Sequence, residues 1–289
     1  MVKKILFLLF CVSVAGSSMS QNHIWRVEIS LNDRLVLPFF IEEEKIKNEV
    51  VLFSIKNGDE KIPLDIKTST NDTIQLSFKE MSSHLKIIYT DSNHFLGYWT
   101  NERKGLRYPI SGSKGNYKRF ESAGDTSSVE ILNSYEITFG SPKDSWPAVG
   151  LFKQNEDKLT GTFLTETGDY RYLEGNVFGD QLYLSCFDGA HAFVFTAKIF
   201  GDSLLGKFYS GASYQTEWKG NGNAEATIGD PNKLTYVTDK SYDLSEIKFK
   251  ALFLGNKKIK FKNKRLTVIQ IMGSWCPNCL DETNYFKVL

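Results

Sequence analysis

Two cysteines separated by two residues, Cys276 and Cys279, have the spacing that supports thiol–disulfide exchange. The surrounding sequence predicts that they stand at the start of a helix, where the positive end of the helix dipole lowers a thiol pKa and favours the thiolate. We therefore predict that Cys276 is the attacking thiolate and that Cys279, one turn into the helix, is the resolving thiol. Trp275 would shield the sulfur atoms, and Pro277 would stiffen the loop.

The cysteines allow three other interpretations. A zinc site needs four ligands, and Cys186 and His191 are badly spaced to complete one, so no metal is expected. A purely structural disulfide would close a loop too short to stabilise the chain much. Cys186 and His191 could form a nucleophile pair, but a buried thiol beside a histidine in a turn is the simpler interpretation.

The elements that position the cysteine pair are predicted from the residues around it. The continuous apolar run 266–272 is typical of a strand buried on both faces of a parallel or mixed sheet. After a short turn the helix begins near Cys276, with Pro277 at its first position, where a missing N–H costs nothing. Asp281 and Glu282 are expected in the first helical turn, beside the positive end of the dipole.

Most of the remaining chain predicts antiparallel β-structure. From about residue 24 to 218, short alternating segments rich in β-branched and aromatic residues are separated by Asn, Asp, Gly and Ser. Asn57-Gly58 predicts a hairpin turn. The most regular part should form a meander, either a twisted sheet or a barrel, with strands at 135–139, 148–154, 158–165, 170–177, 181–187, 192–199, 203–209 and 214–218.

Composition and the N-terminus restrict the class of protein. The chain has 289 residues, 41% of them hydrophobic, with 35 basic and 34 acidic side chains, which does not favour nucleic acid or an anionic membrane as a partner. Residues 1–20 combine Lys3 and Lys4, an apolar run too short to span a bilayer and small residues before Gln21, so they predict an export signal. No transmembrane span is expected after its cleavage, and the compartment would be the periplasm or cell envelope.

The segment 268–282 resembles the active-site strand, turn and helix of TlpA/ResA-like thioredoxin-fold proteins, which are thiol–disulfide oxidoreductases of the bacterial envelope (redoxin, AhpC/TSA type). The resemblance implies that Cys276 and Cys279 carry the redox step and that Glu282 assists proton transfer. Segments 161–165, 168–175 and 186–193 resemble the β-rich N-terminal extension of envelope members. Because the family's fold continues well beyond this helix, the resemblance implies a C-terminally truncated member whose autonomous activity is doubtful.

The expected fold is a mostly β N-terminal region followed by the start of an α/β thioredoxin fold. The divisions are 1–20 signal peptide, 21–125 β-rich region, 126–225 antiparallel meander and 226–289 truncated thioredoxin-like domain.

The leading functional interpretation is disulfide exchange through Cys276 and Cys279, with exported dithiol or disulfide proteins and an envelope electron donor as partners. The redox-active disulfide would be the only redox group, with no cofactor. The alternative is a β-rich binding or interaction module that carries an inert thioredoxin remnant. The sequence does not favour a peroxidase of the peroxiredoxin kind, because the Thr/Ser-x-x-Cys arrangement is missing.

Overall fold

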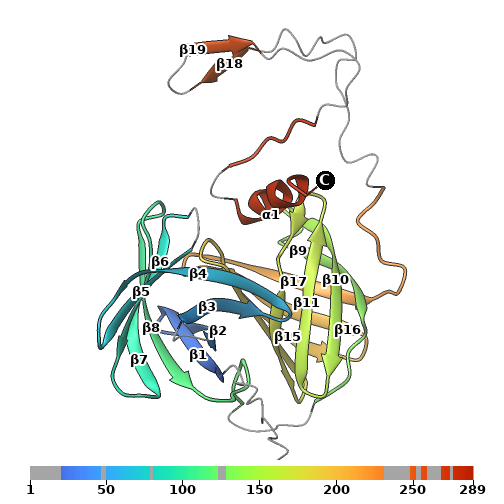
Figure 1. The fold of residues 1–289 in the computed structure, drawn as a ribbon. Helices are drawn as coiled ribbons and strands as arrows, with labels where there is room; N and C mark the ends of the chain where they lie inside the picture. Colours follow the sequence, from blue (N-terminus) through green and yellow to red (C-terminus); the bar gives the residue numbers. More distant parts are fainter. Residues whose placement is uncertain are drawn as a thin grey trace, which may run out of the picture.

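The computed structural model of the chain consists mainly of two β-barrels that lie side by side, with one short helix near the C-terminus (Figure 1). Residues 1–20, which contain the predicted export signal, lie outside the described residues. The described residues are 21–46, 50–78, 81–122, 128–230, 248–251, 255–258, 268–273 and 276–288.

The first barrel is a closed ring of consecutive antiparallel strands. Strand β1 pairs with both β2 and β8, which closes the ring. The strands are β1 (Gln21–Asn32), β2 (Leu35–Ile46), β3 (Val50–Asn57), β4 (Glu60–Ser69), β5 (Thr73–Phe78), β6 (Ser83–Tyr89), β7 (His94–Asn101) and β8 (Leu106–Lys114).

Local sequence explains these strands. In β7 the residues alternate between the barrel interior and its outer face, so that Phe95 is buried while Leu96 is 57% exposed. The predicted hairpin at Asn57-Gly58 is confirmed, because β3 pairs with β4 across this turn. Gly58 adopts a φ of +59°, which glycine reaches without steric cost.

The second barrel also closes on itself. Its strands follow one another around the ring, and an additional pairing between β10 and β11 joins the two ends. The two-residue strand β12 (Gly168–Asp169) pairs with the end of β11. The strands of the ring are β9 (Ser134–Phe139), β10 (Trp146–Asn155), β11 (Lys158–Thr165), β13 (Leu173–Phe178), β14 (Gln181–Phe187), β15 (Ala192–Phe200), β16 (Ser203–Ser210) and β17 (Tyr214–Gly222).

The strands predicted between residues 135 and 218 are found in this barrel, and the largest differences are that β17 extends to Gly222 and that one strand begins late. The strand expected from Tyr170 begins only at Leu173. Arg171 explains the difference, since its φ of +64° is incompatible with a continuous strand. A closed barrel rather than an open twisted sheet forms, because β10 pairs with both β9 and β11.

Side chains from the second barrel complete the core of the first. Phe187, at the end of β14, is fully buried in the first barrel's hydrophobic cluster, together with Ala192 and Val194 of β15. The ring centroid of Phe187 lies 4.5 Å from that of Phe39 and 4.9 Å from that of Trp99. The two barrels therefore share buried apolar surface.

A buried arginine in the connection between the barrels adds polar bonds to this contact. The guanidinium of Arg119, 2% exposed, donates to the Lys56 carbonyl at 2.9 Å and to Asn57 Oδ1 at 2.8 Å. It also donates to Ser185 Oγ at 2.9 Å in the second barrel. A buried charge is tolerated only when it is bonded in this way, so the connection is tied to both barrels.

The C-terminal part forms the predicted helix but, in its described residues, no buried strand before it. It contains a two-stranded hairpin, β18 (Lys248–Ala251) and β19 (Gly255–Lys258), and the helix α1 (Pro277–Phe286). Among the described residues, no helix combines the length and hydropathy needed to span a bilayer. The helix begins where predicted, with Pro277 first, but Asp281 and Glu282 lie beyond its first turn, which contains no acidic residue.

The predicted α/β thioredoxin fold is wrong. In the described part of the run 266–272, residues 268–272 form no strand, and Val268 and Ile271 are 64% and 95% exposed. A buried strand requires neighbours that accept its backbone hydrogen bonds and cover both faces. The described chain supplies no such sheet around these residues. The apolar sequence pattern alone was therefore not sufficient to predict a buried strand.

Candidate functional site

The structure joins the two predicted redox cysteines at the start of α1. Cys276 and Cys279 form a disulfide, with their Cα atoms 5.2 Å apart. Cys276 is the N-cap residue of the helix, and its Sγ accepts a hydrogen bond from the Cys279 backbone N–H at 3.3 Å. This is the position where the helix dipole favours negative charge on sulfur once the bond is reduced.

The remaining predicted site residues do not gather around the sulfur atoms as expected. Glu282 is exposed, and its Oε2 accepts from Gln270 Nε2 at 2.8 Å. Pro277 begins the helix. Trp275, predicted to shield the sulfur atoms, lies outside the described residues. The roles assigned to these residues therefore stay predictions.

Helix α1 is attached to the barrels through Arg171, a residue to which the sequence assigned no function. The guanidinium of Arg171, 8% exposed, donates to Asp281 Oδ2 at 2.7 Å and to Asn278 Oδ1 at 2.9 Å. It also forms an ion pair with Glu60 at the start of β4. Its Nε lies 3.7 Å from Asp188 Oδ2 in the second barrel. Arg171 thus connects both barrels and the helix that carries the cysteines.

The Cys186–His191 pair considered from the sequence does not form. The Cys186 thiol is buried in the core of the second barrel, and burial raises its pKa well above the usual value. His191 Nδ1 instead lies 2.9 Å from Asp188 Oδ2. Burial opposes ionisation of Asp188, but its hydrogen bonds with His191 and its charge interactions with His191 and Arg171 together outweigh burial and keep its pKa below the usual value. Asp188 is a charged structural group and Cys186 a core residue.

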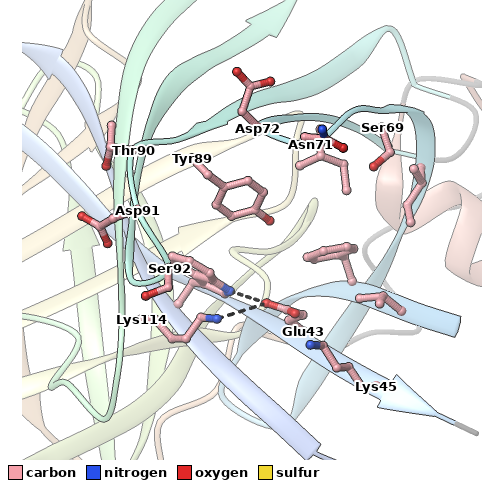
Figure 2. Close-up of a pocket in the computed structure, with 15 residues that line it drawn as sticks. Glu43, Lys45, Ser69, Asn71, Asp72, Tyr89, Thr90, Asp91, Ser92 and Lys114 are labelled. Atoms are coloured by element: carbon pink, nitrogen blue, oxygen red, sulfur yellow. Dashed lines mark hydrogen bonds and ion pairs between the residues drawn. The ribbon is translucent and has the colours of Figure 1, made fainter. Parts of the chain in front are cut away.

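A cavity of about 730 Å³ opens at one end of the first barrel (Figure 2). Its wall is apolar and aromatic, with Trp25, Val51, Phe53, Ile66, Ile74 and Tyr89. Its polar residues include Ser69, Asn71, Thr90 and Ser92, and its charged residues are Glu43, Lys45, Asp72, Asp91 and Lys114. A wall that combines apolar and aromatic side chains with convergent polar groups is typical of a small-molecule site.

Charged and aromatic groups meet on one side of this cavity (Figure 2). Glu43 is 8% exposed, and its Oε2 accepts a hydrogen bond from Trp25 Nε1 at 2.8 Å. Lys114 Nζ lies 4.0 Å from the same oxygen and 4.6 Å from the centroid of the Trp25 ring. Burial, followed by the negative charge of Glu43, raises the pKa of Tyr89 to about 12. Tyr89 is therefore a neutral hydroxyl at physiological pH.

The strand pattern positions these side chains. In β2 the buried residues Leu37, Phe39 and Ile41 share one face with Glu43, because side chains repeat every second residue. Trp25 in β1 is directly opposite Lys114 in β8 in the strand register. This cavity was not predicted from the sequence, although an acidic residue at the inward end of an alternating apolar strand is a signal that could have indicated it.

Comparisons with known proteins do not place the chain in a family. No family model matches the sequence, and no curated protein matches it. One similar solved structure is a mutant of the vaccine antigen Transferrin Binding Protein B from Haemophilus parasuis Hp5, with a TM-score of 0.23 and 10% identity. The match covers 67% of this chain and 65% of that chain, so it spans slightly less than two thirds of that structure's length. Another is intact Ap-TbpB (N and C lobes), with a TM-score of 0.22, 9% identity, and coverage of 70% and 76%. TM-scores this low do not establish a common fold.

The resemblance to TlpA/ResA-like thioredoxin-fold proteins is therefore corrected. The described chain is almost entirely antiparallel β-barrel with one short helix, and no family model supports a redoxin assignment. A Cys-x-x-Cys motif at a helix start is a local feature that needs few residues. It does not require the surrounding parallel sheet that defines the thioredoxin fold.

Proposed function

We propose that this chain is an exported binding module whose ligand site is the cavity at the open end of the first barrel. The observation that supports the proposal is the combination of an apolar, aromatic wall with the inward-facing charged group Glu43. A side chain of this kind is expensive to bury and is not needed to close the barrel. Near the cysteine pair, Gln270 Nε2 and Thr283 Oγ1 donate to the backbone carbonyl of Cys279.

The shared core explains how a barrel could hold such a cavity open. Phe187 of the second barrel fills part of the first barrel's interior, and Arg119 bonds the connection to both. Much of the first barrel's interior is therefore packed, and the cavity lies at one end. A preformed cavity lowers the cost of ordering residues when a ligand binds.

The test uses the neutral fluorescent probe N-phenyl-1-naphthylamine and two matched tryptophan substitutions. Ile66 lines the cavity and is 44% exposed, whereas Leu96 is 57% exposed on the outer face of the same barrel. Saturable probe binding is expected, with Ile66→Trp weakening it about tenfold or more by filling the cavity and Leu96→Trp leaving it unchanged. Equal binding to both variants would contradict the proposal.

The assignment of Cys276, Cys279 and Glu282 to disulfide exchange stays a separate proposal. It is supported by the disulfide at the N-cap of α1, the position that favours a thiolate after reduction. Thiol alkylation of the reduced chain across a pH series tests it, with Cys279→Ser used to observe Cys276 alone. A pKa for Cys276 below that of an ordinary thiol is expected, and an ordinary value would remove the assignment.

A further inference from the structure

The carboxylate of Glu43 has bonding capacity that the protein does not use. One oxygen, Oε2, accepts from Trp25 Nε1 at 2.8 Å and has Lys114 Nζ at 4.0 Å, beyond hydrogen-bond distance. The other oxygen, Oε1, receives no hydrogen bond from any residue that the structure describes. Glu43 is more than nine-tenths buried and lines the cavity. A buried carboxylate with a free acceptor favours a ligand that brings a donor.

Aromatic rings beside Glu43 favour a donor that carries positive charge. The rings of Trp25 and Tyr89 both line the cavity, with their centroids 5.7 Å apart. A ring face attracts a cation, and the protein already places one there, since Lys114 Nζ lies 4.6 Å from the centre of the Trp25 ring. The position next to Glu43 and Trp25 thus accommodates an ammonium group.

The charges around the cavity agree with this preference. The lining contains three carboxylates, of Glu43, Asp72 and Asp91, against the two ammonium groups of Lys45 and Lys114. Within the Glu43–Lys114 pair, the acidic side chain is the more buried one: Glu43 is 10% exposed and Lys114 is 24% exposed. The pKa of Tyr89 is raised first by burial and then by the negative charge of Glu43, which faces the same cavity. An anionic ligand would have to approach the buried carboxylate.

We propose that the cavity of the first barrel binds an organic cation, with the ligand's protonated amine or guanidinium donating to Glu43 and its apolar stem lying along the aromatic wall. This inference rests on the proposed function of the cavity and adds the chemical class of the ligand. The cation could belong to a small amine or to a lysine or arginine side chain of a polypeptide. In the absence of ligand, the ammonium of Lys114 partly occupies the cation position.

The first experiment compares hexylammonium, hexanol and hexanoate, which share one stem and differ in charge, by calorimetric titration of the full chain. Hexylammonium should bind about tenfold or more tightly than hexanol, and hexanoate more weakly than hexanol. Equal binding of all three would overturn the cation inference and leave the cavity as a binding site. Absence of binding by every probe, including N-phenyl-1-naphthylamine, would instead contradict the proposed function.

Substitutions then locate the charge that matters. Glu43→Gln retains an acceptor for Trp25 but removes the charge, and it should reduce hexylammonium binding to the level of hexanol while hexanol is unaffected. The matched control is Asp65→Asn, which removes an exposed carboxylate of β4 outside the cavity lining and should leave hexylammonium affinity unchanged within about twofold. An equal loss in both variants would overturn the role of Glu43.

Lys114→Met separates a binding role from a structural one and does not depend on the stability of the Glu43 variant. Removing the internal ammonium frees Glu43 and the Trp25 ring, so hexylammonium should bind more tightly, by about threefold or more. If Lys114 has only a structural role, removing it should weaken hexylammonium binding, and that result would overturn the inference.

A last comparison tests whether the bound cation belongs to a small amine or to a polypeptide. It uses a peptide with one lysine and the same peptide with norleucine in its place. Tighter binding of the lysine peptide than of hexylammonium indicates a polypeptide cation, whereas equal binding of the two peptides contradicts a polypeptide cation.

Discussion

At the scale of single residues, buried charges are concentrated where the two barrels and α1 meet. Glu60 pairs with Arg171, which also lies near Asp188 and Asp281. Burial raises the pKa of Glu60 above its usual value, against the opposing effect of the Arg171 charge. The carboxylate of Glu60 is therefore less favourable in the folded chain than in the unfolded chain, even with an arginine beside it.

This shift predicts a specific pH dependence of folding stability. Between the unfolded pKa, about 4.5, and the higher folded pKa, the folded chain binds more protons than the unfolded chain, so the Glu60 contribution to stability decreases as pH rises. Urea unfolding of the native chain and of Glu60→Gln should show the native chain losing stability relative to the variant from pH 4.5 upward. Asp188, with its lowered pKa, titrates below this range. Parallel pH profiles would contradict the prediction.

At the scale of elements, α1 depends on the barrels for its position. The helix spans ten residues, which is too short for an isolated helix to be stable in water. Asn278 and Asp281 bond its first turns to Arg171. Leu280 and Thr283 of the helix lie across from Ile62, Pro63 and Phe78 around a small pocket. The geometry of the Cys276–Cys279 disulfide is therefore linked to residues far away in the sequence.

Removing the bonds to Arg171 should release the helix without unfolding the barrels. In the double variant Asn278→Ala with Asp281→Ala, hydrogen exchange of the α1 amides is expected to accelerate, while the amides of both barrels keep their protection. Tyr285→Ala, at an exposed position of the same helix, is the control and should leave exchange of the first turns unchanged. Unchanged exchange in the double variant would show that Arg171 does not hold α1.

At the scale of the whole molecule, the barrels behave as one structural unit in which each contributes to the other's stability. The core of the first barrel contains Phe187, Ala192 and Val194 from the second. Asn57 and Asn101 of the first barrel donate to backbone carbonyls of Phe187 and Gly189 in the second. Such an interface resembles a domain core more than a surface contact, so independent motion of the barrels is not expected.

Truncating the shared aromatic residue should expose this coupling. We expect the native chain to unfold in one calorimetric transition and Phe187→Ala to lose about 3–5 kcal/mol of stability, because a fully buried phenylalanine leaves a cavity. The variant should also separate the unfolding of the two barrels into two transitions. Phe200→Ala, at a 51% exposed position, is the control with little expected change. A single transition with native stability in Phe187→Ala would contradict the coupling.

Patterns that depend on neighbouring residues were read correctly from the sequence. The alternation of inward and outward side chains predicted the strands of the second barrel, and Asn57-Gly58 predicted a hairpin. Pro277 correctly marked the start of α1. The spacing of Cys276 and Cys279 is compatible with the disulfide that forms between them. Each of these features is decided by steric and hydrogen-bonding constraints within a few residues of chain.

Features that depend on distant partners were not available from the sequence. The apolar run 266–272 was expected to be a buried strand, but burial requires covering surfaces that its own residues do not encode. The hydrogen bonds of Arg171 with Asp281 and of Glu43 with Trp25 form only when folding brings these distant residues together. The sequence by itself thus determined the antiparallel strands, their turns and the cysteine pair, all set by short-range geometry. Only the tertiary structure decided that the strands close into two joined barrels and leave a charged cavity, because ring closure and burial are set by contacts between residues far apart in the chain.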